Sequence, residues 1–190
     1  MNFRGDRNYI HSTSLCNYFV ELHENISDFE ITLRDWILRS PLISLEPTGQ
    51  VKGVVKLTSS DIFNTIFYYI QESNIEVTKT EPFDETLMDE MIFYDPLQSN
   101  WQILESNHKD QFTFFDRAIC GGKHLIEHIF NSSKKLILSK LSVELKNIPN
   151  NQLNAKIFVK IESHLGDRLY KLSISDKNHS KIGEMVYYGK

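Results

Sequence analysis

The sequence predicts an α+β protein of two related halves, each with an antiparallel sheet wrapped around a central helix. Two observations support this fold class. Shortly after residue 11 and again after residue 121, apolar residues recur at spacings of three and four, which is typical of one face of a helix. Each of these segments precedes runs in which apolar and polar residues alternate, as in half-buried strands. We therefore expect a first half over 1–75, a crossover segment over 76–110 and a second half over 111–190.

The first half opens with a helix predicted from Ser12 to Glu24. Its start carries hydroxyl residues that can cap a helix, and its apolar face consists of Leu15, Tyr18, Phe19 and Leu22. Alternating runs then predict strands over 29–33, 42–45 and 51–57. From residue 59 to residue 73, the apolar residues Ile62, Phe63, Ile66, Phe67 and Ile70 indicate a second helix.

The rest of the chain divides into a crossover and a strand-rich end. Residues 75–101 keep no period and contain Pro82 and Pro96, which predicts irregular chain with at most one short strand. An aromatic strand over 112–115 should lead through Gly121-Gly122 into a helix. Four strands follow, over 135–145, 155–163, 168–175 and 181–188, with hairpin turns at 164–167 and 176–179.

The two halves show signs of an internal repeat. A shift of 110 positions places Asp6 on Asp116 and Arg7 on Arg117, so that an Asp-Arg pair precedes the predicted helix in both copies. A chance likeness between two amphipathic helices is the alternative. If the repeat is real, each half has the plan of the hotdog fold, in which a long sheet wraps one helix, and the chain is a double hotdog.

Two short segments resemble enzymes of that fold. Residues 6–15 resemble the opening motif of acyl-thioester hydrolases of the hydroxybenzoyl-coenzyme A type, in which an acid, a histidine and aromatic residues surround the helix start. Residues 7–13 and 121–125 resemble the double-hotdog acyltransferase/decarboxylases of polyketide pathways. These resemblances imply chemistry on acyl thioesters, in a channel that runs between the halves and meets the amino-terminal end of one helix.

The first group of candidate site residues lies at the start of the first predicted helix. His11 could act as a general base or orient a carbonyl, or it could simply cap the helix. Tyr9 could donate to an oxyanion or accept an acyl group. Asp6 is a candidate catalytic carboxylate, although a structural pair with the adjacent arginine is the alternative. Ser12 and Thr13 should contact the substrate beside His11.

The second group surrounds the glycine pair. We expect Gly121 and Gly122 at a helix amino terminus, where backbone N–H groups would stabilise a thioester carbonyl that acquires negative charge; a tight turn is the alternative. His124 would then stand in the first helical turn, either as a neutral acid-base group or as an exposed residue. Cys120 could be a nucleophile or a small buried residue. For Asp116 a structural pair with Arg117 is favoured.

Composition narrows the class of function. With 21 Lys and Arg against 25 Asp and Glu, the net charge is −4, so we expect no nucleic-acid partner. No apolar stretch approaches the length of a membrane span, and two cysteines are too few for a disulfide framework, which favours a cytoplasmic protein. The close pair His124 and His128 lacks the zinc-protease pattern, and no phosphate-binding or dinucleotide glycine pattern occurs, so we expect neither metal nor cofactor.

Together these features predict an enzyme that processes acyl-CoA or acyl-carrier-protein thioesters by hydrolysis, acyl transfer or dehydration. Dehydration would pair His11 with an acid of the other half, such as Glu127. Two alternatives stand beside it: a non-catalytic acyl-binding module, and an interaction protein that uses Tyr187 and Tyr188 at a sheet edge. The chain should form a pseudo-dimer by itself, and further homodimerisation is left open.

Overall fold

One long antiparallel sheet forms the main body of the protein. The structure is a computed structural model that describes residues 1–4, 8–23, 25–60, 64–84, 87, 90–95, 100–103, 112–131, 134–147 and 156–190. Across the sheet, β3 (Pro41–Ser44), β5 (Thr65–Glu72), β4 (Gly53–Ser59) and β2 (Ile26–Leu33) come first. The sheet continues with β9 (Leu136–Glu144), β12 (Lys181–Gly189), β11 (Leu169–Ser175), β10 (Ile157–Leu165), β8 (Asn100–Ile103) and β7 (Ile92–Asp95).

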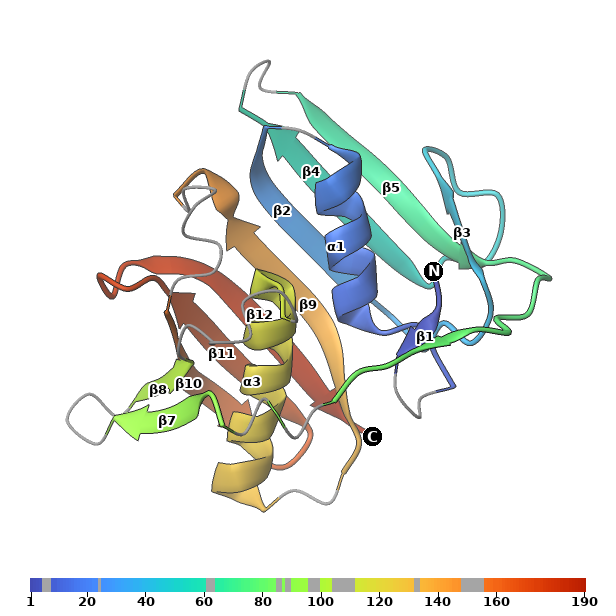
Figure 1. The fold of residues 1–190 in the computed structure, drawn as a ribbon. Helices are drawn as coiled ribbons and strands as arrows, with labels where there is room; N and C mark the ends of the chain where they lie inside the picture. The colour runs from blue at the N-terminus through green and yellow to red at the C-terminus, as the bar shows by residue number, and fades with distance from the viewer. Residues whose placement is uncertain are drawn as a thin grey trace.

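Two helices, α1 (Ser12–Leu22) and α3 (Phe114–Phe130), lie on the same face of this sheet (Figure 1). Helix α1 covers the strands of the first half, and α3 covers those of the second. The chain is therefore an α+β protein with two tandem hotdog-like halves, as predicted. A separate parallel pair joins β1 (Phe3–Arg4) to β6 (Thr80–Glu81), and a 3-10 turn, η1 (Leu145–Asn147), follows β9.

The seam between the halves is the pairing of β2 with β9. Phe29 stands opposite Val143 and Ile31 opposite Leu141, and all four side chains are at most 1 % exposed. The ring of Phe29 also packs on Phe115 of α3, with 5.2 Å between the ring centroids. Because apolar burial is the main favourable term in folding, this seam makes the two halves one unit.

The first helix agrees with its prediction. Helix α1 begins at Ser12 and ends two residues before the expected Glu24. It buries Thr13, Leu15, Cys16 and Phe19 against the sheet. Among the described residues, no helix is long and apolar enough to cross a membrane.

The predicted strand over 112–115 is wrong, because α3 begins there. Thr113 is the N-cap of α3: its side chain accepts the Asp116 N–H at 3.1 Å, and the Asp116 carboxylate accepts the Thr113 N–H at 3.0 Å. This reciprocal capping box starts α3 at Phe114. The repeat predicted a start at residue 122, which is 110 positions after Ser12, so the helix begins eight residues earlier than expected. Asp116 and Arg117 therefore lie in the first turn of α3 and not ahead of the helix.

The predicted helix over 59–73 is wrong where the structure describes it, and Ile62 and Phe63 lie outside the described residues. Residues Thr65–Glu72 form β5, which pairs with β3 on one side and with β4 on the other. Ile66, Tyr68 and Ile70 stand opposite apolar positions of β4, and the Tyr68 ring packs on Phe19 of α1. An apolar run of alternate residues also satisfies a spacing of four, and β-branched and aromatic side chains favour the strand.

The remaining strand predictions are confirmed to within a few residues, including both hairpin turns of the carboxyl-terminal meander. Two strands appear in the predicted crossover beyond the single one expected: β7 and β8 form a hairpin, and β8 pairs with β10. The halves also differ in connectivity. From β9 the chain passes to β10, β11 and β12 in turn, whereas from β2 it passes to the edge strand β3, then to β4 and β5. The domain limits at 75 and 110 stay a prediction.

Helix α3 packs tightly against the sheet at Gly122. A Cβ atom at this position would lie 2.8 Å from Met185 Cε, 3.1 Å from Tyr187 Oη and 3.3 Å from Leu172 Cδ2. These three neighbours belong to β11 and β12. The glycine therefore allows close contact between helix and sheet, a role different from the helix start that the sequence suggested.

We expect Gly122→Ala to lower the free energy of unfolding by about 1–2 kcal/mol, although alanine is the better helix former by about 1 kcal/mol. The added methyl group would force Met185 and Tyr187 to shift. Urea denaturation measures the difference. Gly49→Ala is the control, because its Cβ would make only an ordinary contact with Gln71 at 3.6 Å. Equal stability of the Gly122 variant and the native protein would contradict the close packing.

Candidate functional site

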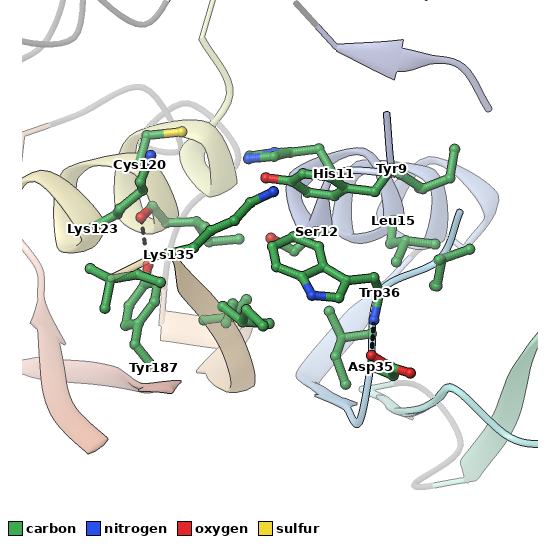
Figure 2. A pocket seen from close by; sticks show the side chains of 17 residues that line it. Tyr9, His11, Ser12, Leu15, Asp35, Trp36, Cys120, Lys123, Lys135 and Tyr187 are labelled. Atoms are coloured by element: carbon green, nitrogen blue, oxygen red, sulfur yellow. Dashed lines mark hydrogen bonds between the residues drawn. The ribbon is translucent and has the colours of Figure 1, made fainter. Parts of the chain in front are cut away.

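A cavity of about 90 Å³ lies between the two halves, where the start of α1 faces the middle of α3 (Figure 2). The chain before α1 and its first turns contribute Tyr9, Ile10, His11, Ser12 and Leu15. Helix α3 contributes Ile119, Cys120 and Lys123, and the segment after β2 contributes Leu33, Asp35, Trp36 and Ile37. Residues 135–138 at the start of β9 and Tyr187 of β12 complete the lining.

The inner wall of the cavity is apolar and buried. Leu15, Ile119, Cys120, Leu138 and Tyr187 are each at most 4 % exposed. They come from α1, α3, β9 and β12, so both helices and the sheet contribute to this wall. Such a surface favours a hydrocarbon group over water.

The mouth of the cavity is aromatic and charged. The Lys135 ammonium lies over the rings of Tyr9 and Trp36, 4.7 and 4.3 Å from their centroids. A hydrogen bond from Lys52 at 3.0 Å lowers the pKa of Asp35, so this carboxylate is ionised at neutral pH. Figure 2 shows Tyr9 and His11 pointing from the α1 side toward α3, with the end of Lys135 between them and Cys120.

His11 is held by a chain of polar contacts that crosses between the helices. Its Nδ1 lies 2.7 Å from Thr13 Oγ1, and Arg4 donates to the same oxygen at 2.6 Å. Arg4 also forms an ion pair and hydrogen bond with Asp116 of α3. The Arg4 guanidinium lies on the ring of Phe83, 3.9 Å from its centroid. The imidazole at the start of α1 is thus connected to the first turn of α3.

The chemistry of this chain limits the role of His11. A guanidinium only donates, so Thr13 Oγ1 accepts from Arg4 and keeps its own proton. When the Thr13 hydroxyl donates a hydrogen bond to Nδ1, the neutral imidazole carries its proton on Nε2 and can donate to a carbonyl. When Nδ1 carries the proton and donates to Thr13 instead, Nε2 is unprotonated and can act as a base. In both forms the Thr13 contact holds one ring nitrogen and orients the other.

Burial raises the pKa of two groups near the cavity, Cys16 and Tyr187. Burial raises the pKa of the Cys16 thiol well above its usual value, and the charge of Asp116 raises it further. Burial likewise raises the pKa of Tyr187, and the two thiols Cys120 and Cys16 add to the effect. These groups are therefore neutral at pH 7. Cys16 and Cys120 are not joined in a disulfide bond.

The structure brings together part of the predicted site. Tyr9, His11, Ser12 and Cys120 line the same cavity, and Thr13 is fully buried behind His11. Asp6 lies outside the described residues.

The predictions for the glycine pair and its neighbours are wrong in position. Cys120, Gly121, Gly122 and His124 lie in the body of α3 and not at its amino terminus, because the capping box starts the helix at Phe114. Of these four residues only Cys120 lines the cavity. A stabilising role for the backbone N–H groups of the glycines is lost, since a helix interior uses those groups in its own hydrogen bonds.

Several residues around the cavity were not predicted: Arg4, which contacts Thr13, and Trp36, Lys123 and Lys135, which line the mouth. For Asp116 a structural pair with Arg117 was favoured, and the structure shows its ion pair with Arg4. Only Asp116 left a signal in the sequence, the Thr-x-x-Asp spacing of its capping box. The remaining residues come near His11 only in the folded protein, and no local sequence pattern indicates this proximity.

Two further expectations concern metals and surfaces. Within the described ranges, no three His, Cys, Asp or Glu side chains gather closely enough to hold a metal ion. Tyr187 is 2 % exposed and lines the cavity, so its predicted place on an interaction surface is wrong, whereas Tyr188 is 46 % exposed. Alternation along β12 places these neighbouring side chains on opposite faces of the sheet.

No protein-family model matches the sequence, and no curated protein is significantly similar to it. Among solved structures, the TesB protein of Mycobacterium avium subs paratuberculosis is similar at 8 % identity and a TM-score of 0.48, over 100 % of this chain and 91 % of that one. An acyl-ACP thioesterase from Bacteroides thetaiotaomicron is similar at 7 % identity and a TM-score of 0.42, over 98 % and 92 % of the two chains. The dehydratase domain of MlnD from Bacillus amyloliquefaciens is similar at 8 % identity and a TM-score of 0.42, over 97 % and 85 %. Likenesses this distant carry no argument about the activity of this chain.

We expect Asp116→Asn to lower the free energy of unfolding by about 2–4 kcal/mol, because it leaves the largely buried Arg4 without its counter-charge. Urea denaturation measures the change. Glu30→Gln is the matched control: it removes an exposed pair with Lys140 and should cost less than about 1 kcal/mol. Similar values for the two variants would show that the Arg4–Asp116 pair does not hold the halves together.

The raised pKa of Cys16 predicts a loss of stability in alkaline solution. The folded protein keeps the thiol proton at a pH where the unfolded chain has lost it, so the contribution is complete below about pH 8.5 and is lost as pH rises. Unfolding free energies measured by urea from pH 7 to about pH 10 should therefore fall. In Cys16→Ala the fall should be shallower. An unchanged slope would assign the alkaline loss to other groups.

Proposed function

We propose that the chain is an enzyme that acts on an acyl thioester of coenzyme A or an acyl carrier protein, with His11 as its catalytic histidine. The observation that carries the proposal is the cavity itself, which joins an oriented imidazole and a helix amino terminus to a buried apolar wall. The acyl group would lie against the apolar wall, and the thioester carbonyl would lie beside His11.

The start of α1 supports this placement of the carbonyl. His11 is the N-cap of α1, and its side chain makes no capping hydrogen bond. The first backbone N–H groups of a helix have no partner within the helix, and the positive end of its dipole stabilises negative charge. A thioester oxygen that becomes negative during attack on its carbon would be stabilised there.

His11 would serve the attack as a general base or hold the carbonyl as a donor. The Thr13–Arg4–Asp116 chain fixes the ring, so little reorganisation is needed when the substrate binds. Hydrolysis and acyl transfer both need only this histidine and a nucleophile. Dehydration needs a second acid–base group. The carboxylate of Asp35 is engaged by Lys52, that of Asp116 by Arg4 and the capping box, and the expected partner Glu127 pairs with Lys123 and does not line the cavity. Hydrolysis or transfer is therefore the favoured reaction.

The mouth of the cavity suits the carrier. Lys123 and Lys135 both line it, and ammonium groups attract the phosphates of coenzyme A or of a phosphopantetheine arm. Trp36 and Tyr9 offer flat apolar surface beside them. The non-catalytic acyl-binding module uses the same cavity, so turnover is the measurement that separates the two functions.

We expect His11→Ala to lower kcat/KM for the best acyl-CoA or acyl-carrier-protein thioester by about 10²-fold or more, the usual contribution of a general base. Thiol release from a panel of thioesters measures it, with circular dichroism to confirm folding. His23→Ala is the matched control, because His23 follows α1 and contacts Tyr68, far along the helix from the cavity. Native protein that binds acyl thioesters and never turns them over would instead identify a binding module.

A further inference from the structure

We infer that Tyr187 sets the upper limit on the length of the acyl chain, and that the preferred substrates carry short acyl groups. The inference rests on the proposed function, because it concerns the same cavity. The cavity of about 90 Å³ is smaller than the roughly 150 Å³ of an engineered protein cavity that holds one benzene ring, which leaves room for only a few carbon atoms beyond the carbonyl.

Tyr187 stands at the inner end of the cavity. Lys135 at the mouth is exposed, whereas the Tyr187 side chain is 2 % exposed and reaches the cavity from β12. Figure 2 shows its ring beside the α3 segment that carries Cys120, on the opposite side of the cavity from Trp36. An acyl chain that enters between the lysines and passes His11 would therefore meet the phenol ring.

The ring is fixed in this position by contacts with α3. The Tyr187 hydroxyl donates to the carbonyl of Ile119, which is itself a cavity residue. Gly122 accommodates the hydroxyl, since a Cβ there would lie 3.1 Å from Tyr187 Oη. Met185 Sδ lies 3.7 Å from the same oxygen. Because these contacts hold the hydroxyl at the tip of the side chain, moving the ring aside for a longer chain would break the hydrogen bond to Ile119.

Behind the Tyr187 ring, buried apolar side chains of the sheet pack against α3. The neighbours of Gly122 there are Met185 and Leu172, which are both fully buried apolar side chains. Removing the phenol ring would join this apolar region to the cavity. Methionine is unbranched and adapts its shape readily, so a longer hydrocarbon chain could extend along α3.

The test compares Tyr187→Ala, Tyr187→Phe and Tyr170→Ala with the native protein. Tyr170 stands opposite Tyr187 on β11 and is equally buried, but it does not line the cavity. Each protein is given straight-chain acyl thioesters from acetyl to dodecanoyl, and kcat/KM is measured for every length. Binding of the matching non-hydrolysable thioethers is measured by calorimetry on the same proteins.

The native protein and Tyr170→Ala should prefer short chains, and Tyr187→Phe should shift less toward long chains than Tyr187→Ala, because it keeps the ring but loses the hydrogen bond to Ile119. In Tyr187→Ala the ratio of long-chain to short-chain kcat/KM, and of the corresponding affinities, should rise by about tenfold or more, as expected for about two further buried methylene groups. An unchanged profile in Tyr187→Ala, the same shift in Tyr170→Ala, or a native preference for long chains would each overturn the inference. If Tyr187→Ala does not fold, Tyr187→Leu replaces it with the same expected direction.

Binding separates this inference from the proposed function. If the native protein binds thioethers but turns over no thioester, the catalytic proposal fails, and the length limit is still decided by the affinities of the variants. If the native protein turns over thioesters and its length profile does not respond to Tyr187→Ala, only the inference fails. Absence of both turnover and binding would overturn both.

Discussion

The pairing of β2 with β9 is the constraint on which the rest of the structure depends. It joins a group of four strands, β3 to β2, and a group of six strands, β9 to β7, into one sheet, and it sets α1 and α3 on the same face. Because the pairing is antiparallel and its inward side chains are buried, a slip of one residue would turn this apolar set to the solvent. The register therefore also fixes how the start of α1 meets α3, and with it the cavity.

The pairing of β2 with β9 brings the two helices together, and polar contacts between the helices then fix the orientation of individual side chains. Arg4 precedes α1, and Asp116 belongs to the first turn of α3, so their ion pair ties the two halves at a point outside the sheet. A largely buried ion pair contributes little net stability, because desolvation offsets the attraction, yet losing one partner is costly. Such a pair is better at selecting one arrangement than at strengthening it. Here the selected arrangement orients Thr13 and, through it, His11.

Sequence patterns predicted most of the sheet and only part of the helices. Strands in which buried and more exposed residues largely alternate, such as β9 and β12, were predicted well because one face of each is buried. The error over 65–72 arose because isoleucines and aromatics at alternate positions also fit a helical stripe, and only pairing with β3 and β4 decides between them. The error at 112–115 was avoidable, since Thr113 and Asp116 have the spacing of a capping box.

The part of the candidate site that lies at the start of α1 was predictable from the sequence, and the part contributed by distant segments was not. His11 and Tyr9 were identified because they adjoin a helix start that the sequence reveals. The partners that orient or surround them come from more distant segments: Asp116 is 105 positions from His11, and Lys135 is 124 positions from it. No periodicity connects such residues. Only the seam brings them together, and it depends on burial along whole strands.

The two helix starts explain why the protein has its cavity at one of them. At α3, Thr113 and Asp116 satisfy the terminal N–H groups, and the acid offsets the positive end of the helix dipole. At α1, the N-cap side chain makes no such bond, the first turn holds no acid, and the imidazole is turned toward Thr13 instead. A helix start without a side-chain cap is less stable by about 1 kcal/mol, and in the function we propose an acyl carbonyl bound there would offset this cost. The halves thus share a plan but differ at their helix starts: a capping box closes the start of α3, whereas the start of α1 adjoins the cavity.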